Sequence, residues 1–281
     1  MASTSPTKIG RNLIGNRWGL TLISLFTTFF LIYLFIPPVW KLTEGPIKIT
    51  RWPKTGEQVF VVGPATEHWV KVTSVSRHVI NAIIVAEDNR FYNHPGVDFI
   101  AIKKSIEKNI AERRFARGGS TITQQVVKMT LLSPEKTLLR KTREAVGSLL
   151  LERILDKSQI LEWYINLAEF GDGVFGIKAA AEHYFDTSPE LLTIQHGAHL
   201  ALVLPSPNGW SVGLRKRELT EFGHKRYKKI IDQLLSQRFI TQALYESALA
   251  TGDFGRPIKE HANPFSSKNV NKEISKNSPT N

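Results

Sequence analysis

The hydrophobic and polar positions divide the chain into an apolar N-terminal run and a longer amphipathic part. Residues Gly19 to Trp40 carry no charged side chain over 22 positions, and a membrane-spanning helix needs about 20 residues. The residues before this run include basic side chains and no acidic one. By the positive-inside rule, we predict a cytoplasmic tail over 1–18, a single transmembrane helix over 19–40, and the rest of the chain outside the cytoplasm.

A cleaved signal peptide is the alternative explanation of the apolar run. The run is long for a signal peptide, and no small-x-small cleavage site follows it. Instead, Pro37 and Pro38 follow, and a proline pair ends a helix. These features favour an uncleaved anchor.

The part that follows begins with a connector and continues in helices. Residues 41–70 are punctuated by proline and glycine, and the β-prone piece Glu57–Val62 predicts short strands there. From Ser76 onward apolar side chains recur at helical spacing. The expected helices cover about 76–87, 98–114, 120–131, 138–155, 158–170, 176–185, 189–204, 215–238 and 242–250, with Ser76, Asp98, Ser120 and Ser158 as caps. We predict a mainly α-helical domain over 71–250, then a polar, disordered tail over 251–281.

Composition narrows the kinds of ligand. The chain of 281 residues has no cysteine, which excludes disulfides and thiolate metal sites. Its formal net charge of +12 predicts an anionic partner such as nucleic acid, lipid headgroups or a phosphorylated substrate. If the anchor places the domain outside the cytoplasm, nucleic acid becomes an unfavourable choice.

Two adjacent carboxylates, Glu87 and Asp88, end the first predicted helix in the sequence EDNRFYNHPG. A carboxylate at the end of a buried helix can have a raised pKa, which suits a general base. Two solvated acids at a helix C-terminus are the alternative, because Glu-Asp pairs are common.

The sequence GGSTITQQVVK, from Gly118 to Lys128, combines a turn with a helix start. Thr121, Gln125 and Lys128 share one face of that helix. The free N–H groups after the two glycines form an anion site. Together they fit a sugar-phosphate ligand, and an ordinary amphipathic helix is the alternative.

A third polar cluster is RKTRE, in which Arg140 and Glu144 stand four residues apart with Lys141 beside them. The alternative to a functional role is a surface ion pair, which contributes about 0.3–0.5 kcal/mol.

These three segments together closely resemble the glycosyltransferase family 51 domain of peptidoglycan synthesis. The matching motifs are Glu87-Asp88-x-x-Phe91-x-x-His94-x-Gly96, then GGSTITQQ, then Arg140-Lys141-x-x-Glu144, then KSQILEWYIN from Lys157 to Asn166. The resemblance covers about residues 70–235, with the motifs in the family's order and spacing. The segments AEFGDGVFGIKAAAEHYF and LALVLPSPN are similar to the monofunctional branch of the family.

The resemblance implies a lysozyme-like, two-lobed helical domain behind the N-terminal helix, on the periplasmic face of a bacterial inner membrane. It implies that Glu87 is the catalytic base and Glu144 the second essential carboxylate. It places Lys128, Arg140 and Lys141 against the substrate pyrophosphates, with Lys136 at a further basic position. The residues that would build the cleft are Asp88, Phe91, His94, Ser120, Thr121 and Gln125. Lys128 is followed by Met129 where many relatives have Asn.

The chemistry of the implied substrate, lipid II, agrees with these residue types. Pyrophosphate leaves as a weak base, so cations have to neutralise its charge and no general acid is needed. A base has to take the proton of the acceptor's 4-hydroxyl, and displacement of the α-linked pyrophosphate gives a β-1,4 bond with inversion. A glycosidase instead needs an acid and a second carboxylate. Mg²⁺ and Mn²⁺ are candidate cofactors, with Asp88 or Glu144 as contacts, and no organic cofactor is expected.

Two rival functions stay open. A lytic enzyme of similar fold would cleave the same glycan, but it does not need the Lys/Arg cluster. A non-catalytic membrane scaffold of the cell-wall machinery would have no use for both Glu87 and Glu144. Expected partners are lipid II, the growing glycan chain and membrane phospholipids, with other cell-wall synthesis proteins as further candidates and no nucleic acid.

Other patterns have simpler explanations. Gly171 to Gly176 matches G-x-G-x-x-G but follows a predicted helix, whereas a dinucleotide site requires a strand. The transpeptidase motifs S-x-x-K, S-x-N and K-T-G do not occur in that order, which predicts a monofunctional enzyme. His196 and His199 favour packed or capped histidines over a zinc site. The basic stretch 103–117, beside several apolar residues, predicts contact with a membrane surface over a solvated face.

Overall fold

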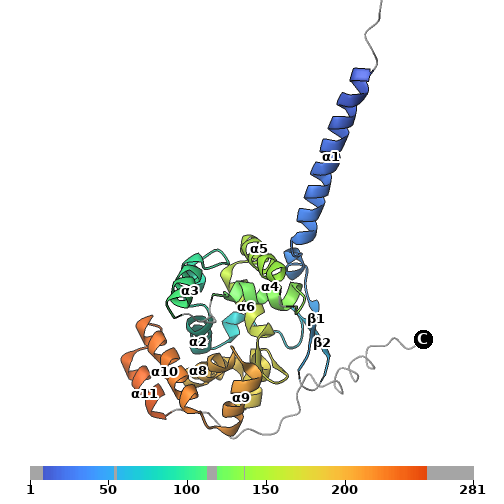
Figure 1. Ribbon diagram of the computed structural model, residues 1–281. Coiled ribbons are helices and arrows are strands. Elements are labelled where there is room, and N and C mark those ends of the chain that lie inside the picture. The colour runs from blue at the N-terminus through green and yellow to red at the C-terminus, as the bar shows by residue number, and fades with distance from the viewer. Residues whose placement is uncertain (1–8, 54–55, 113–118, 136, 252–281) are drawn as a thin grey trace, which may run out of the picture.

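The computed structural model describes residues 9–53, 56–112, 119–135 and 137–251, and it is mainly helical, as predicted (Figure 1). The elements are, in chain order, α1 (Ile9–Phe35), η1 (Val39–Leu42), β1 (Ile47–Arg51), β2 (Gln58–Val62), η2 (Val72–Ser74), α2 (Arg77–Glu87), η3 (Phe91–Asn93), α3 (Phe99–Glu112), α4 (Ile122–Leu131), α5 (Leu138–Ile154), α6 (Lys157–Leu167), β3 (Glu169–Gly171), β4 (Val174–Phe175), α7 (Ile177–Phe185), η4 (Pro189–Leu191), α8 (Ile194–Val203), α9 (Pro207–Lys216), α10 (Glu221–Ser236) and α11 (Gln242–Thr251).

Helix α1 projects away from the rest of the protein (Figure 1). It covers Ile9–Phe35 instead of the expected 19–40. It ends before Pro37, because a proline lacks the N–H that continues a helix and disfavours helical geometry in the residue before it. Among the residues that the structure describes, no helix combines the length and hydropathy that a membrane span requires.

The chain between α1 and the helical body packs directly onto helix α5. Val39 and Leu42 of η1 are buried in the core, and Nε of Arg143 donates to the carbonyl oxygen of Phe35 over 3.0 Å. A methyl group on Gly147 would lie 3.0 Å from Cγ of Pro37 and 2.8 Å from Cγ1 of Val127. The glycine therefore lets α5 approach both neighbours closely.

Helices α2 and α8 cross at the centre of the core. Val79, Ala82 and Ile83 form the buried face of α2, and every residue of α8 is buried. A methyl group on Gly197 would meet Cα of Val79 at 2.9 Å, so only glycine permits this crossing. The close packing fixes the end of α2, where Glu87 and Asp88 stand.

Several helix boundaries differ from the sequence prediction for local reasons. Thr121, not Ser120, caps α4, because its hydroxyl accepts from Gln124 N and the Gln124 side chain accepts from Thr121 N. Asp156, not Ser158, caps α6 with Gln159 in the same way, and a carboxylate is a strong cap. These capping boxes set the first turn one or two residues away from the expected serine.

Other predicted helices are divided or shortened. The expected helix 215–238 is two helices, α9 and α10, because Thr220 caps a new start. The expected helix 189–204 is a short turn, η4, followed by α8 with Thr193 as its cap. The helix predicted to end near Phe170 stops at Leu167, and Phe170 lies in strand β3.

Two small antiparallel hairpins flank the helices. β1 pairs with β2 in the register Ile47↔Val62 to Arg51↔Gln58, within the region where short strands were predicted. β3 pairs with β4 across a bulge, so the G-x-G-x-x-G pattern at Gly171 does follow a strand, contrary to expectation. That strand belongs to a tight hairpin and not to a parallel sheet, and Tyr184 donates to Phe170 O behind it over 3.0 Å.

The two histidines of α8 are packed and capped, as predicted. The His196 ring stacks on Phe185 with 4.1 Å between ring centroids, and its Nδ1 accepts from Thr193 N over 3.3 Å. A hydrogen bond of 2.7 Å joins Nδ1 of His199 to the carbonyl of Gln195. Both rings therefore belong to the core and the helix cap.

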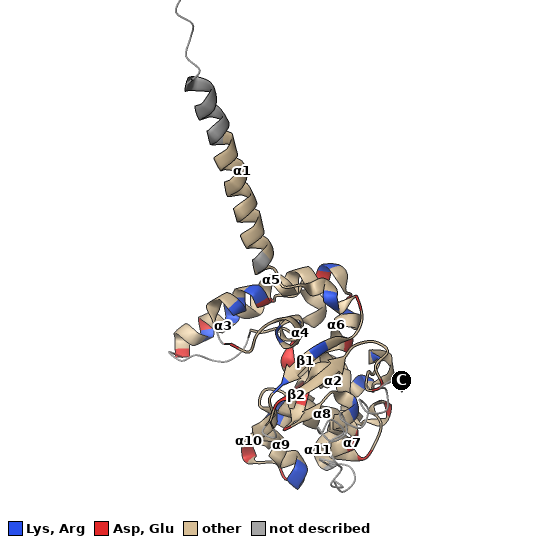
Figure 2. Cartoon of the chain, turned by 90° about the vertical axis from the view of Figure 1, so that its right-hand side faces the viewer, with Lys and Arg blue, Asp and Glu red and all other residues tan. Residues whose placement is uncertain are grey.

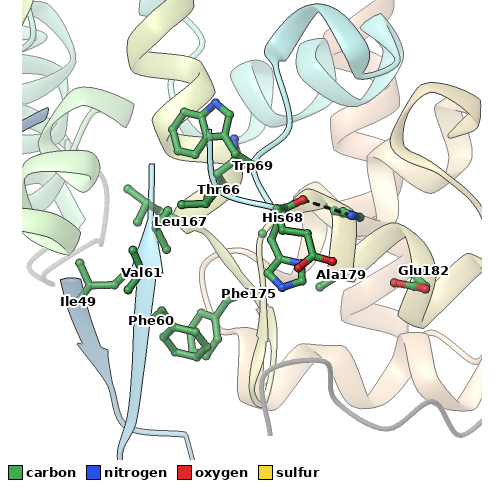
Figure 3. Close-up of a pocket in the computed structure, with 15 residues that line it drawn as sticks. Ile49, Phe60, Val61, Thr66, His68, Trp69, Leu167, Phe175, Ala179 and Glu182 are labelled. Carbon is green, nitrogen blue, oxygen red and sulfur yellow. Dashed lines mark hydrogen bonds between the residues drawn. The ribbon is translucent and has the colours of Figure 1, made fainter. Parts of the chain in front are cut away.

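A cavity of about 250 Å³ lies between the β1–β2 hairpin and the elements α6, β4 and α7 (Figure 3). Phe60 and Phe175 form an aromatic pair along it, with ring centroids 5.1 Å apart. Ile49, Leu167 and Phe175 also line a larger cleft on their other side. These side chains are thus a thin wall between the cavity and the cleft.

Candidate active site

Glu87 occupies the last position of α2, and its carboxylate faces helix α4. Nε2 of Gln125 donates to Oε2 of Glu87 over 2.9 Å. Burial raises the pKa of Glu87, and Asp88 adds to this, while the hydrogen bond from Gln125 and the charges of Arg226 and Lys128 oppose it. A half-buried carboxylate with a raised pKa has the properties of a general base.

Asp88, in contrast, forms hydrogen bonds within the protein through both of its carboxylate oxygens. Nε2 of His94 lies 2.9 and 3.0 Å from its two oxygens, and Ile122 N donates to Oδ2 over 3.0 Å. Gly96 N donates to Nδ1 of His94 over 3.2 Å, so the ring carries its proton on Nε2, toward Asp88. The residue next to Glu87 is therefore fastened to the N-terminus of α4.

A second contact of this turn, between Thr121 and Gly96, also fixes the start of α4. The Thr121 hydroxyl donates to Gly96 O over 2.6 Å. Gly96 has a φ of +96°, and a methyl group there would meet Ser148 O at 2.5 Å, so glycine is required at this approach. Phe91 is fully buried beneath the turn, with Nζ of Lys157 4.5 Å from its ring centroid.

Glu144 is buried at 2% exposure and binds two cations of its own helix. Arg140 Nη1 donates to Oε2 over 2.8 Å, and Lys141 Nζ bonds to Oε1. Lys141 also donates to the Ser120 hydroxyl over 2.8 Å, which connects α5 to the turn before α4. The surface ion-pair interpretation of this cluster is wrong, because the carboxylate is enclosed.

Lys128 differs from the other two cations, because no ion pair within the described part of the chain holds its ammonium. The side chain is exposed at the edge of the cleft. Partial burial lowers its pKa, as do Arg140, Lys141 and Arg51, while Glu144 opposes them. An uncompensated ammonium among other cations is suited to bind an anion.

The cleft has a volume of about 640 Å³ and runs from α4 and α5 to strand β1 and the segment after α8. Of the predicted site residues, Gln125, Lys128 and Arg140 line it directly. Glu87 adjoins it through Gln125. Asp88, Phe91, His94 and Thr121 are buried behind this edge, and Ser120 is exposed at the turn. Lys136 lies outside the described residues.

Two arginines near the site, Arg226 and Arg51, were not predicted from the sequence. Arg226 of α10 acts on the charge of Glu87, and it is held by the Leu202 carbonyl at 3.3 Å and the Trp210 ring at 5.1 Å. Arg51 of β1 lines the cleft beside Lys128. Arg226 stands among other basic residues of an amphipathic helix, and Arg51 precedes every motif, so neither carried a distinguishing signal.

The carboxylates proposed for a divalent cation do not fit that role. Asp88 and Glu144 already accept from protein donors at both oxygens. Asp88, His94 and Asp98 do lie together in the geometry of a metal site. However, the proton of His94 faces Asp88, and Asp98 accepts from Ala101 N and pairs with Arg90 at 3.3 Å. These side chains form a hydrogen-bonded network instead.

The family model described as Transglycosylase matches residues 55–235. The chain is 38% identical over 208 residues to a biosynthetic peptidoglycan transglycosylase of Dechloromonas aromatica, which covers 69% of this chain and 88% of that one. It is 43% identical over 181 residues to the protein of that name from Cupriavidus metallidurans, covering 63% and 77%. It is 40% identical over 193 residues to the protein of that name from Nitrosomonas europaea, and this match covers 67% of this chain and 77% of that one.

A crystal structure of penicillin-binding protein 1A from Haemophilus influenzae matches with a TM-score of 0.38 at 17% identity, over 82% of this chain and 24% of that one. This similarity is too low to establish a shared fold. The family match, by contrast, spans well over half of the chain and includes Glu87, Lys128 and Glu144. The chain therefore belongs to the transglycosylase family.

Proposed function

We propose that this protein polymerises lipid II into β-1,4-linked glycan strands with inversion, releasing undecaprenyl pyrophosphate, and that Glu87 is the general base. As a member of its family the chain is a glycosyltransferase of peptidoglycan synthesis. The observation that carries the mechanism is the position of Glu87. Its carboxylate has a raised pKa and lies beside Gln125, at the end of a cleft that carries Lys128 and Arg140.

The acceptor's 4-hydroxyl would lose its proton to Glu87 as its oxygen attacks the sugar carbon that bears the pyrophosphate. The C–O bond to pyrophosphate breaks on the opposite side, which inverts the configuration. Gln125 orients the carboxylate, and Arg226 limits how far its pKa can rise. Asp88 and His94 hold the turn in place, so this mechanism gives them a positioning role.

The departing pyrophosphate would be stabilised by cations of α4 and α5. Lys128 is free to bind a phosphate oxygen, because no ion pair among the described residues holds its ammonium. Arg140 and Lys141 share Glu144, so this carboxylate fixes their direction instead of acting as a second base. A divalent cation, Mg²⁺ or Mn²⁺, would belong to the substrate's pyrophosphate, since Asp88 and Glu144 have no free oxygen.

We further propose that α1 is a single-pass anchor in a bacterial inner membrane, with a cytoplasmic N-terminus and a periplasmic catalytic domain. Most of its described side chains are exposed and apolar, with Phe26 and Phe29 each 70% exposed. Helices α3 and α5 lie at the end of the domain from which α1 leaves (Figure 2); α3 carries lysines, and α5 carries both lysine and arginine. Exposed Phe99 and Ile106 accompany the lysines of α3, which suits contact with phospholipid headgroups.

We also propose that the described helices form two lobes. The helices around α3, α4 and α5 and those around α8 and α10 would be the two lobes of a lysozyme-like domain. The protein would meet other cell-wall synthesis proteins at the membrane.

One assay tests the proposed reaction against both rivals. The purified full-length protein in detergent is given lipid II with a labelled sugar, and the products are separated by size. Polymer that a muramidase digests is the expected result. Cleavage of preformed glycan without polymerisation would instead identify a lytic enzyme, and an absence of either reaction would identify a scaffold.

A further inference from the structure

Strand β1 forms one wall of the substrate cleft although it precedes the region that the family model matches. Residues 48–52 line the cleft together with Lys128 and Arg140, whereas the match begins at residue 55. Behind the strand, Ile49 separates the cleft from the cavity of Figure 3. Ile49 is therefore a thin part of this wall, with the cavity on one side and the cleft on the other.

Arg51 lies on the inner face of this strand. Side chains two residues apart share a face of a strand, and the partner of Arg51 on that face, Ile49, is buried, while Lys48 is exposed. On the inward face of a strand a guanidinium loses its contact with water, and apolar neighbours offer it no hydrogen-bond acceptor in return. Burial accordingly lowers the pKa of Arg51.

The hydrogen bonds of Arg51 do not account for its position. Nη1 donates to the neighbouring Thr50 O over 3.2 Å, whereas Nη2 is enclosed and has no partner. Within the described residues no ion pair joins the guanidinium to a carboxylate. Arg140 at the same cleft, by contrast, is held by Glu144 at 2.8 Å. A charged donor left without an acceptor in an enclosed place is unfavourable unless a ligand completes it.

The charges around Arg51 indicate what kind of ligand that is. Arg51 is close enough to Lys128 to contribute to the lowered pKa of that ammonium, after burial as the largest cause. Glu169 is the carboxylate that acts on Arg51, and its Oε1 is likewise enclosed and without a hydrogen-bond partner. Two neighbouring cations, neither of which is held in an ion pair among the described residues, attract a group with two or more negative charges.

We propose that Arg51 is a further substrate-binding residue, which binds a phosphate of the pyrophosphate group together with Lys128. This inference rests on the proposed function, because it assigns Arg51 to the pyrophosphate of that substrate. Glu169, which lines the same cleft, acts on the guanidinium through its charge and is not bonded to it. The β1–β2 hairpin is then part of the active site, and a domain that begins at the family match lacks one of its anion contacts.

The test measures pyrophosphate binding and lipid II turnover on the full-length protein. Inorganic pyrophosphate is titrated by calorimetry at fixed ionic strength into the wild type, Arg51→Ala, Arg51→Gln and Arg51→Lys. We expect binding to weaken about tenfold in the first two variants, as for loss of one charge-assisted hydrogen bond, and partial recovery in Arg51→Lys. In the turnover assay we expect a higher KM for lipid II with a smaller change in kcat.

Lys229→Ala is the matched control, because it removes one exposed cation of α10 that does not line the cleft. It should leave both measurements unchanged. Melting temperatures separate binding from folding: a purely structural Arg51 predicts a lower melting temperature with unchanged KM. Pyrophosphate affinity of Arg51→Gln equal to that of Lys229→Ala overturns the proposal. Since this titration needs no lipid II, it decides the role of Arg51 even if the proposed polymerisation fails.

Discussion

Gln125 donates a hydrogen bond of 2.9 Å to the carboxylate of Glu87, and thereby joins the end of α2 to the first turns of α4. The two residues come from separate sequence motifs. Their contact places a carboxylate of raised pKa beside the cation-bearing edge of the cleft. The catalytic predictions depend on this relationship.

Replacing Glu87 by Gln should abolish polymerisation and leave the fold intact. The amide has the shape of the carboxylate but cannot accept the proton, and general-base catalysis contributes about 10²–10⁴-fold. Turnover of labelled lipid II and the circular-dichroism spectrum are measured on the same sample. Near-normal turnover by a folded Glu87→Gln protein would remove this residue from the mechanism.

The pH dependence of both activity and stability should show the raised pKa of Glu87. The acid limb of kcat/KM should lie above the usual glutamate range, near 4.3, because burial raises this pKa while Gln125, Arg226 and Lys128 oppose and Asp88 assists. Replacing Arg226 by Gln should move the limb to higher pH. An unshifted limb in that variant would contradict the assigned electrostatics.

The folded state holds the proton of Glu87 more tightly than the unfolded chain, so the resulting stabilisation is full below the unfolded pKa and is lost as the pH rises through the folded pKa. Relative to the wild type, Glu87→Gln should therefore gain melting temperature between acidic and neutral pH. A constant difference across that range would mean that the two states share one pKa.

Lys128→Ala and Arg140→Ala should differ in their effect on stability. Both should slow turnover roughly 10–100-fold, as for loss of a contact of about 1.5–3 kcal/mol. Lys128 is exposed and unpaired within the described structure, so its loss should leave the melting temperature unchanged. Arg140→Ala removes a partner of the enclosed Glu144, which should cost about 1–3 kcal/mol. Unchanged turnover in either variant would contradict the proposal that this residue binds the pyrophosphate.

Asp88→Asn should destabilise the protein by about 1–3 kcal/mol and reduce turnover. Asp88 accepts from both His94 and Ile122 N, whereas an asparagine would direct its own amide hydrogens at one of them. Chemical denaturation checks the stability. The matched control is Asp156→Asn, because asparagine caps a helix as well as aspartate does, and the exposed Asp156 caps α6 outside this network. Equal losses of unfolding free energy in the two variants would show that the buried hydrogen bonds of Asp88 contribute no more to stability than an ordinary helix cap.

Long periodic elements and contiguous motifs could be predicted from the sequence. The apolar face of α2 and the carboxylates that end it follow from helical spacing, and the cations of α5 follow from their motif. The β3–β4 hairpin could not be predicted, because strands of two or three residues carry no usable periodicity. Adjacent hydroxyls left the cap of α4 ambiguous between Ser120 and Thr121.

The missed arginines illustrate a different limit. Arg226 lies on a helix with several other basic residues, and only the packing of α10 beside α2 reveals that it acts on Glu87. The role of Arg51 could be inferred only from the structure, which shows that its Nη2 is enclosed and has no hydrogen-bond partner. Sequence patterns identify chemistry within one segment, whereas these contacts depend on how distant segments pack.

The close approach of Pro37 to Gly147, together with the bond from Arg143 to the Phe35 carbonyl, has a mechanical consequence. Both contacts lie where α1 joins the domain, so they couple the orientation of α1 to that of α5. A tilt of α1 would turn the helix that carries Arg140 and Glu144. In the proposed orientation, the thickness of the bilayer would thereby set the height at which the cleft meets its lipid substrate.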